Sequence, residues 1–342
     1  MYKLAAGLVE RRVPTDLVLV KRIGPYLQQL PGAVRVVDLN SRRMIESIPA
    51  LVRYLRNERP ACLISALSHA NVVAILSHMI ARSPAKLIVS ERTPPLQAKM
   101  NAKLFRDRLL PFLIRLLYKH ANRVVAVSYD VADQLGIIGV PRKKISVVYN
   151  PVVNDALLQM AIEAVDHPWF APGAPAIIVA AGRLAIEKDF QTLIRAFSLV
   201  RNSRPLRLMI LGEGEDRAEL CNLAEQLGVA DDVSLPGFVD NPYKYMRCAM
   251  VFILSSLFEG FPNVVVEAMA CGAPIISTNC PSAAEILENG RWGRLIPVGD
   301  VGALAKTIQE VLDEASHPDV KSRARIFSVD KMTDQYLKII AA

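Results

Sequence analysis

The sequence predicts an α/β protein made of two doubly wound domains that face each other across a cleft. The chain has 342 residues, too many for one ordinary α/β core and about right for two. Short apolar runs rich in β-branched residues alternate with segments of helical periodicity, which is typical of a parallel sheet covered on both faces. This alternation breaks after Asn150-Pro151 and then starts again. Two such arrays indicate two domains, with ligands expected beyond the carboxyl ends of the strands.

The first domain is expected to span residues 1–150. Its strands are expected at 16–21, 34–39, 62–67, 86–90, 123–128 and 146–149. The second domain is expected to span 151–328, with strands at 176–182, 206–212, 233–237, 250–256 and 274–278 and helices at 189–201 and 215–228. Residues 329–342 are expected to form a helix that packs back toward the first domain.

The composition restricts the class of protein. With 52% hydrophobic and 22% charged residues, wholesale disorder is excluded. The cysteines are odd in number and form no C-x-x-C pair, which argues against a disulfide framework or a zinc site and favours a reducing compartment. They are Cys62, Cys221, Cys248, Cys271 and Cys280. No secretion-signal pattern follows Met1 and no apolar run reaches about 18 residues, so a cytoplasmic protein without spanning helices is expected.

The charge is distributed unevenly along the chain. Residues 1–150 hold 24 Lys+Arg and 9 Asp+Glu, a net of +15, whereas residues 151–342 hold 17 and 24, a net of −7. The first domain is therefore expected to face an anion, which could be a phospholipid surface, a lipid pyrophosphate or nucleic acid. Residues 95–121 mix apolar and basic side chains, with Pro111 expected to kink or split the helix. This segment fits a helix on an anionic membrane and a solvated core helix equally well.

The most informative stretch, residues 259–274, reads EGFPNVVVEAMACGAP and follows an expected strand directly. Pro262 is placed for the first helical turn, and Gly272 is placed to end the helix. The free N–H groups of such a helix start suit a pyrophosphate. Glu259 in the preceding loop can meet sugar hydroxyls, and Glu267, two turns in, can meet ribose hydroxyls, since carboxylates accept from neighbouring hydroxyls. The residues expected to bind a ligand here are Glu259, Gly260, Phe261, Asn263, Val264, Val265 and Glu267.

A second motif, GRLAIEK at residues 182–188, follows the first strand of the second domain. Arg183 and Lys188 can clamp a diphosphate without a metal, and Gly182 lets the backbone approach closely. Gly237 and Phe238 end another strand and can border a nucleobase. The Gly-Glu-Gly sequence at 212–214 lacks a third glycine, so a tight turn is its favoured interpretation.

Together these elements resemble glycosyltransferase family 4, which has the GT-B architecture. The resemblance covers 182–300 through the motifs G-R-L-x3-K, L-P-G-F, S-x-x-F-E-G-F-P-N-V-V-V-E-A-M-A-C-G-A-P and G-x-L-I-P-V-G-D. It implies that Arg183 and Lys188 bind the donor diphosphate, that Glu259 binds the donor sugar and that Glu267 binds ribose. It also implies that the enzyme retains the anomeric configuration and requires no metal or other cofactor.

The first domain resembles the family more loosely. Family members normally begin with a strand and a glycine-rich loop, and neither precedes the helix-like segment that starts at Lys3. Candidates for acceptor chemistry are His69, after the strand at 62–67, and Glu91 with Arg92, after the strand at 86–90. A lone histidine is more often structural, whereas a charged pair after a buried strand requires a partner or a function.

The sequence therefore favours a retaining hexosyltransferase that uses a UDP-sugar, with a GDP-sugar as the lesser possibility. Its expected catalytic residues are Glu259, Glu91 and His69. The expected acceptor is a lipid-linked or polysaccharide intermediate at the inner face of the cytoplasmic membrane, and no nucleic-acid partner is expected. A nucleotide-sugar epimerase and a non-catalytic homologue of a transferase are the alternatives.

Overall fold

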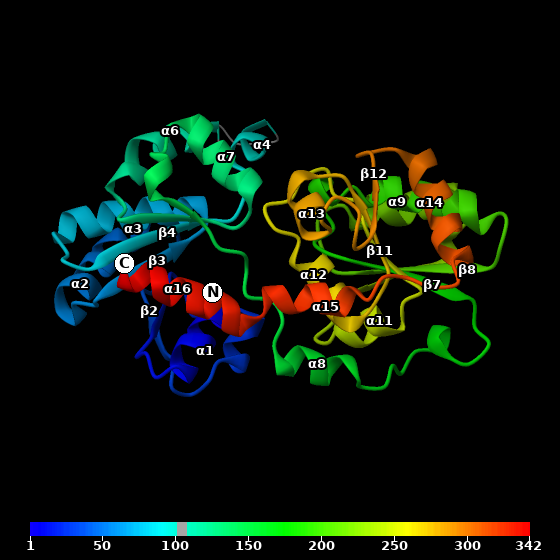
Figure 1. Ribbon diagram of the computed structural model, residues 1–342, viewed down its shortest axis with the longest axis horizontal. Helices are drawn as coiled ribbons and strands as arrows, with labels where there is room; N and C mark the ends of the chain where they lie inside the picture. Colours follow the sequence, from blue (N-terminus) through cyan, green and yellow to red (C-terminus); the bar gives the residue numbers. More distant parts are fainter. Residues whose placement is uncertain (101–107) are drawn as a thin grey trace. The chain divides into compact units, whose positions relative to one another are not determined.

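The computed structural model describes residues 1–100 and 108–342, and Figure 1 shows its elements along the chain. It divides into two compact units. The first contains Met1–Pro151 and Val329–Ala342, and the second contains Val152–Ser328. Each unit is an α/β structure with parallel strands only, as the sequence predicts.

The first unit contains two parallel sheets. The two-stranded sheet pairs β1 (Asp16–Leu19) with β2 (Arg35–Asp38). The four-stranded sheet has the order β3 (Cys62–Ala66), β4 (Lys86–Glu91), β5 (Arg123–Ala126) and β6 (Ile145–Val147). The helices of this unit are α1 (Tyr2–Glu10), α2 (Ile48–Glu58), α3 (Ser68–Ala81), α4 (Pro95–Met100), α6 (Leu110–Leu117), α7 (Tyr129–Ile138) and α16 (Val329–Ala341).

Helices α1 and α16 lie side by side on the four-stranded sheet, although more than 300 residues separate them (Figure 1). Leu4 and Leu8 of α1 share a core with Met332 and Tyr336 of α16 and with Ile88 of β4. A second core lies under α2 and α3, where Leu51, Leu55 and Val73 are buried. The apolar sides of these helices cover the sheet, which is why the sheet residues that they contact are apolar as well.

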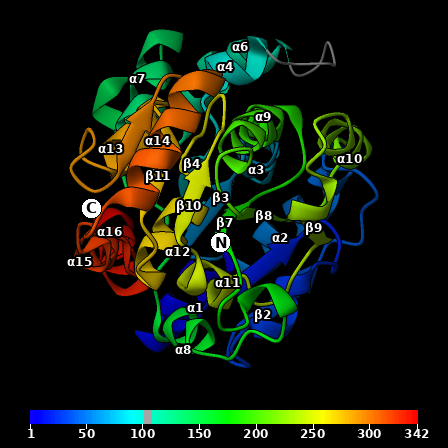
Figure 2. The same ribbon diagram turned by 90° about the vertical axis from the view of Figure 1, so that its right-hand side faces the viewer.

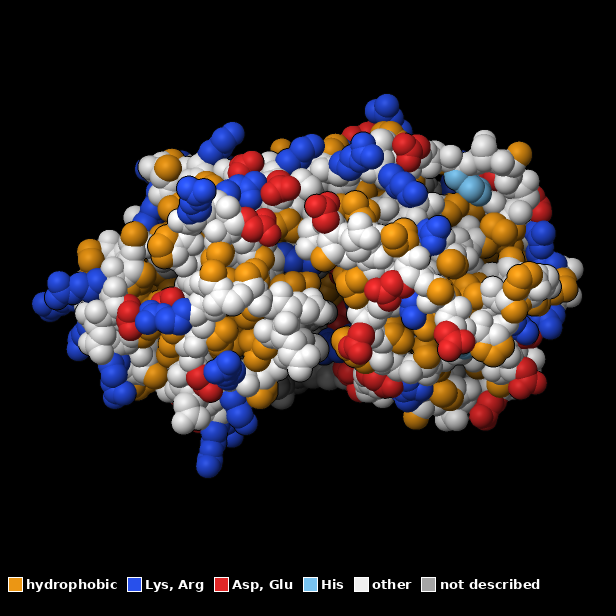
Figure 3. Space-filling model, turned by 90° about the horizontal axis from the view of Figure 1, so that it is seen from below, with side chains coloured by type: hydrophobic (Ala, Val, Ile, Leu, Met, Phe, Trp, Pro, Cys, Tyr) orange, Lys and Arg blue, Asp and Glu red, His pale blue; other side chains and the backbone are white. Residues whose placement is uncertain are grey.

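The basic stretch 95–121 is only partly described. Helix α4 ends at Met100, residues 101–107 with Lys103 and Arg106 lie outside the described residues, and α6 begins at Leu110 with Pro111 in its first turn. Proline suits that place because the first N–H groups of a helix have no acceptor within it. Figure 3 shows lysine and arginine side chains projecting from the face of the first unit that it draws. No described helix is both long and apolar enough to cross a bilayer.

The second unit is built on one six-stranded parallel sheet with the order β12-β11-β10-β7-β8-β9. Figure 2 faces this unit and shows the order of its strands. The strands are β7 (Ala176–Ala181), β8 (Leu206–Leu211), β9 (Val233–Gly237), β10 (Val251–Leu254), β11 (Ile275–Thr278) and β12 (Arg294–Ile296). The helices are α8 (Asp155–Ala161), α9 (Phe190–Arg201), α10 (Arg217–Gln226), α11 (Tyr243–Cys248), α12 (Asn263–Cys271), α13 (Pro281–Ile286), α14 (Val301–Asp313) and α15 (Val320–Ala324).

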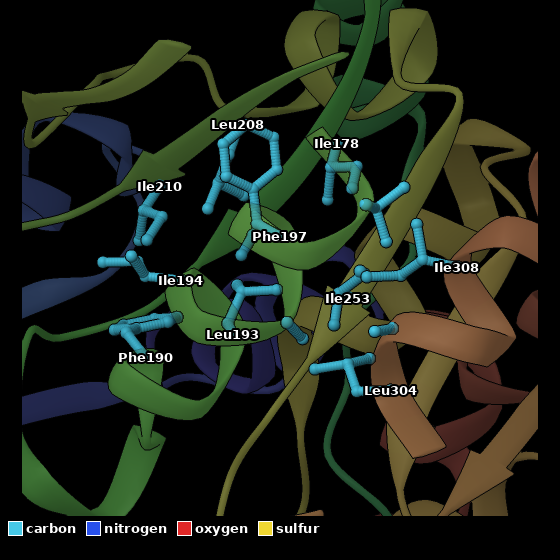
Figure 4. Close-up of a cluster of buried hydrophobic side chains, with 14 of the residues drawn as sticks. Ile178, Phe190, Leu193, Ile194, Phe197, Leu208, Ile210, Ile253, Leu304 and Ile308 are labelled. Atoms are coloured by element: carbon cyan, nitrogen blue, oxygen red, sulfur yellow. The ribbon is translucent and has the colours of Figure 1, made fainter. Parts of the chain in front are cut away.

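A core of apolar side chains covers one face of this sheet. Leu193 and Phe197 of α9 and Leu304 and Ile308 of α14 pack against one face of the strands, as Figure 4 shows. Ile178 of β7 belongs to the same buried cluster. Apolar side chains cover this face of the sheet, so polar side chains that could bind a ligand are expected in the loops at the strand ends.

Candidate functional site

The order of strands in the second unit points to the carboxyl end of the sheet, where the strand order reverses, as the place for a ligand. From β7 the chain proceeds outward through β8 and β9, and then returns to place β10 on the other side of β7. The loops that follow β7 and β10 therefore leave the sheet in opposite directions. In open α/β sheets, ligands bind at the carboxyl ends of the two strands where the order reverses. Both motifs singled out in the sequence follow these two strands, 182–188 after β7 and 259–267 after β10.

An ion pair joins the two motifs at this edge. Lys188 Nζ lies 2.5 Å from Glu259 Oε1, and both side chains are more than four-fifths buried, with 17% and 13% of their area exposed. Ser256 Oγ donates to the same carboxylate oxygen at 2.8 Å. A charge pair with so little exposure is tolerated because each charge has a partner. The structure thus brings Lys188 and Glu259 together, 71 positions apart in the sequence.

Arg183 lies nearby in the chain but is placed differently. Its guanidinium donates to the carboxylate of Glu187, and 63% of its side chain is exposed. The hydrogen bond to Glu187 raises the pKa of Arg183. Burial raises the pKa of Glu187, but the hydrogen bond from Arg183, a backbone hydrogen bond and the charges of Arg183 and Lys188 together outweigh burial, and the pKa is lowered. Arg183 therefore keeps its charge and is accessible to an anion that displaces Glu187.

Glycines bring the loops after β7 and β8 into direct contact. Gly212 has φ +147°, and a β-carbon there would lie 1.9 Å from the carbonyl oxygen of Gly182. Gly182 N donates to Leu211 O at 3.0 Å, and Gly212 N donates to Gly237 O at 2.9 Å. Only glycine permits this approach of backbone to backbone. Residues 212–214 themselves form no turn, which comes at residues 215–216 before α10, and the two glycines hold the backbone of this segment against the 182–188 loop.

Helix α12 presents one face that is not buried. Asn263 is exposed, Val264 and Glu267 are half-buried, and the other six residues of the helix are buried. Spacings of three and four residues place Val264 and Glu267 with Asn263 on one side, within about one turn of the helix start. Glu267 is four residues after the first residue of the helix, so it lies about one turn in and not the two turns expected from the sequence.

The sequence predicts free N–H groups at the start of this helix, on Asn263, Val264 and Val265, and this prediction is wrong in part. Asn263 N donates to Phe261 O at 2.9 Å, and Val265 N donates to Pro262 O at 3.0 Å. A tight turn before the helix thus satisfies two of the three donors. Gly272 ends the helix in the left-handed conformation with φ +89°, as predicted.

Several other residues predicted to bind the donor lie in the core. Phe261 packs edge-to-face against Phe327 at a ring-centroid distance of 5.6 Å, and Val265 is fully buried. Gly260 and Gly237 are also buried, so these four positions can reach a ligand only through their backbone. Phe238, in contrast, is 58% exposed. The sequence did not single out Ser256 or Ser282, whose hydroxyls donate to the Glu259 side chain and main chain. The available signal for Ser256 was its position just after the buried strand β10, whereas Ser282 is the second residue of α13 and had no such signal.

In the first unit, Glu91 is a fully buried carboxylate at the end of β4. Tyr118 Oη donates to it at 2.6 Å and Ser68 Oγ at 2.9 Å, and the N–H groups of Arg92 and Thr93 donate to the same side chain. Such enclosure is typical of a carboxylate that holds its neighbours in place, so a direct contact between Glu91 and an acceptor is no longer expected. His69, in the first turn of α3, is exposed.

Stability should reveal the charge state of Glu91. Burial raises the pKa of this carboxyl group, against the hydrogen bonds from Tyr118 and Ser68. A raised folded-state pKa gives a contribution that is complete below the unfolded value, about 4.3, and is lost as pH rises through the folded value. The free energy of unfolding of the protein, relative to a Glu91→Gln variant, should therefore fall as pH rises, by at most about 1.4 kcal/mol per pH unit. Chemical denaturation of both proteins from pH 4.5 to 8 measures this. The exposed Glu10→Gln variant is the control, and a pH-independent difference for Glu91→Gln would contradict the assignment.

Among the described residues, no group of three or more His, Cys, Asp or Glu side chains is arranged to hold a metal ion. The charged side chains of the two motifs are Arg183, Glu187, Lys188, Glu259 and Glu267. A nucleotide diphosphate offers matching groups, with anionic phosphates for the two cations and vicinal hydroxyls for the carboxylates of Glu259 and Glu267.

Comparison with protein families gives two matches that together cover most of the chain. Residues 1–155 match the family described as Glycosyltransferase Family 4, and residues 162–326 match the family described as Glycosyl transferases group 1.

Curated relatives match over most of their length. The Campylobacter jejuni N-acetylgalactosamine-N,N'-diacetylbacillosaminyl-diphospho-undecaprenol 4-alpha-N-acetylgalactosaminyltransferase is 30% identical over 281 residues, which is 80% of this chain and 74% of the relative. The Rhizobium meliloti lipopolysaccharide core biosynthesis glycosyltransferase LpsE is 26% identical and covers 78% of this chain and 79% of the relative.

Solved structures share the fold. Sucrose-phosphate synthase from Thermosynechococcus elongatus matches with a TM-score of 0.83 and 18% identity over 99% of this chain and 91% of that one. HepE from Anabaena, solved with UDP and glucose, matches with a TM-score of 0.81 and 18% identity over 99% and 94%.

Proposed function

The chain belongs to glycosyltransferase family 4 and has the GT-B fold, and from this membership we propose that it transfers a hexosyl group from a UDP-sugar to a lipid-linked or polysaccharide acceptor with retention of the anomeric configuration. Family membership also decides against the nucleotide-sugar epimerase considered from the sequence. The observation that carries the proposal is the Lys188–Glu259 pair at the reversal point of the second unit's sheet.

The proposed donor site uses the charges at that edge. Negative charge accumulates on the departing diphosphate during transfer, and Arg183 and Lys188 stabilise it without a metal ion. Glu259 accepts hydrogen bonds from the donor sugar, while Glu267 accepts them from the ribose. Ser256 and Ser282 keep Glu259 in position through their hydrogen bonds to it. The bound UDP of HepE supports uridine over guanosine as the donor base.

The acceptor class follows from the relatives and the charge of the first unit. The Campylobacter jejuni relative is named for a diphospho-undecaprenol acceptor, and LpsE is named for lipopolysaccharide core biosynthesis. A lipid-linked acceptor requires the enzyme to work at a membrane, which we place at the inner face of the cytoplasmic membrane. His69 and Arg92 are the acceptor-side candidates, with Glu91 as a positioning residue for the loop that carries Arg92.

Helix α6 supports attachment to an anionic membrane surface. Its buried side holds Ile114 and Leu117, while Phe112 and Leu116 on the opposite side are 64% and 46% exposed. Arg115 belongs to the same helix, and the net charge of residues 1–150 is +15. Exposed apolar side chains beside cations suit the boundary of an anionic bilayer.

Nucleotide release tests the proposed function directly. We incubate the full chain with UDP-sugars or GDP-sugars and a glycan linked to a lipid diphosphate. It should release UDP, and the sugar in the product should keep the α-configuration that it has in the donor. EDTA should leave the rate unchanged within about twofold, because two side-chain cations balance the diphosphate. Loss of activity with EDTA that Mg²⁺ restores would contradict the metal-free site. Binding of UDP without release from any sugar would identify a non-catalytic homologue.

A further inference from the structure

A basic pocket lies in the first unit, at the end of its four-stranded sheet where the strands begin. Strands β4, β5 and β6 are parallel neighbours, so the residues at their starts meet at one edge, opposite to the edge that holds Glu91. Lys86 and Arg123 begin β4 and β5, and Lys143 and Lys144 directly precede β6. The pocket is open and has a volume of about 400 Å³. It is lined by Lys86, Asn122, Arg123, Lys143, Lys144 and Ala342.

Backbone carbonyls, instead of carboxylates, hold the cations of this pocket. Lys144 Nζ donates to the carbonyl oxygens of Lys119 at 2.5 Å and Ala121 at 2.7 Å. Lys86 Nζ donates to Ile340 O at 3.0 Å, and Arg123 Nη1 donates to Lys143 O at 3.0 Å. Within the described part of the chain, none of these cations forms an ion pair. They contrast with Arg35 and Arg201, which pair with carboxylates elsewhere.

Hydrogen-bond donors remain available in the pocket. An ammonium has three donors and a guanidinium has five, so Lys86 and Arg123 each use only part of their capacity. The Asn122 Oδ1 atom accepts from Leu87 N at 2.8 Å, which leaves its amide N–H groups as donors. Lys143 is exposed and makes no contact through its ammonium in the described structure. The pocket thus offers donors and no side-chain carboxylate.

Like charges held this closely repel each other, and a multivalent anion relieves the repulsion. The other two lining residues, Asn122 and Ala342, have uncharged side chains, so no side chain of the lining offsets the four positive charges. A phosphoryl group has several acceptor oxygens and about two negative charges, which matches cations on three converging segments. We propose that this pocket binds a phosphoryl group, either the headgroup of an anionic phospholipid or a soluble phosphate. The site belongs to the opposite edge of the sheet from the proposed acceptor residues and is independent of the proposed function.

Binding by a neutralised variant tests the proposal. The Arg123→Gln/Lys143→Gln protein removes two charges that form no ion pair and no hydrogen bond with another side chain among the described residues, so its fold should be kept. The control is Lys21→Gln/Arg22→Gln, which removes two exposed charges from the same unit. In calorimetric titrations with inorganic phosphate and glycerol 1-phosphate, the wild-type and control proteins should show saturable binding, and the pocket variant should bind at least about tenfold more weakly.

Vesicles distinguish the two sources of the phosphoryl group. If a lipid headgroup is the ligand, phosphatidylglycerol–phosphatidylcholine vesicles should sediment the wild-type and control proteins at a lower lipid concentration than the pocket variant, in which the exposed apolar side chains of α6 still contact the bilayer. Equal sedimentation of all three, together with the expected loss of phosphate binding, identifies a soluble phosphate. Phosphate affinity that is the same in all three proteins, or absent from the wild type, overturns the proposal. UDP affinity should be unchanged throughout, because the proposed donor site lies in the second unit.

Discussion

Replacing Lys188 by methionine should lower kcat/KM for the donor sugar by about 100- to 1,000-fold, the usual effect of removing one preorganised charge from a departing anion. Lys188 lies at the reversal point of the sheet, and its ion-pair partner, Glu259, comes from the second motif. Steady-state kinetics with a UDP-sugar and a lipid-linked acceptor measures the change. Arg204→Met is the matched control, because Arg204 is a cation of the same unit that pairs with Asp313 away from this edge.

A purely structural role for Lys188 makes a different prediction. Removing one partner of a mostly buried ion pair leaves the other charge uncompensated, which destabilises by about 3 kcal/mol or more. The Lys188→Met/Glu259→Gln protein removes both charges and should restore stability to near the wild-type value. If its activity equals that of Glu259→Gln alone, Lys188 only balances Glu259. We expect its activity to stay well below that of Glu259→Gln alone, because the diphosphate still lacks its cation.

The second large effect is expected at Glu267. Replacing it by glutamine removes a charged acceptor for two ribose hydroxyls, and hydrogen bonds to charged groups contribute about 1.5–3 kcal/mol. Donor affinity should therefore fall by roughly 10- to 100-fold, measured by calorimetric titration with UDP and with the UDP-sugar. The exposed Glu225→Gln variant, on α10 of the same unit, should bind normally. Equal affinities for all three proteins would place the ribose elsewhere.

Much of the fold could be predicted because its strands are buried apolar runs. The eleven expected strands are present, including Lys86–Glu91 and Ala176–Ala181, which are almost entirely buried. Strand β12 (Arg294–Ile296) was missed because it is only three residues long and begins with an exposed arginine. The separation of β1 and β2 from the four-stranded sheet was also not predictable, since sheet pairing depends on contacts between distant segments.

The site could be predicted in its motifs but not in its partners. Gly272 correctly predicted the end of α12, because it adopts the left-handed conformation that favours glycine. The Lys188–Glu259 ion pair was not foreseen, because both residues had been assigned to ligands and not to each other. The burial of Phe261 and Val265 could not be predicted either, because a ligand-binding loop and a core loop can contain the same apolar residues.

The place of α16 has a consequence for how the chain is made. The ribosome completes α1, β4 and β5 early, yet the side chains that cover Leu4, Ile88 and Val125 include Met332 and Tyr336, which emerge last. The second unit, Val152–Ser328, lies wholly within this interval and can fold as a body during synthesis. The first unit instead keeps an uncovered apolar surface until α16 has been synthesised. Chaperone binding to the nascent chain would therefore be concentrated on its first half, and a premature stop after residue 328 would spare the second unit while depriving the first of its final layer.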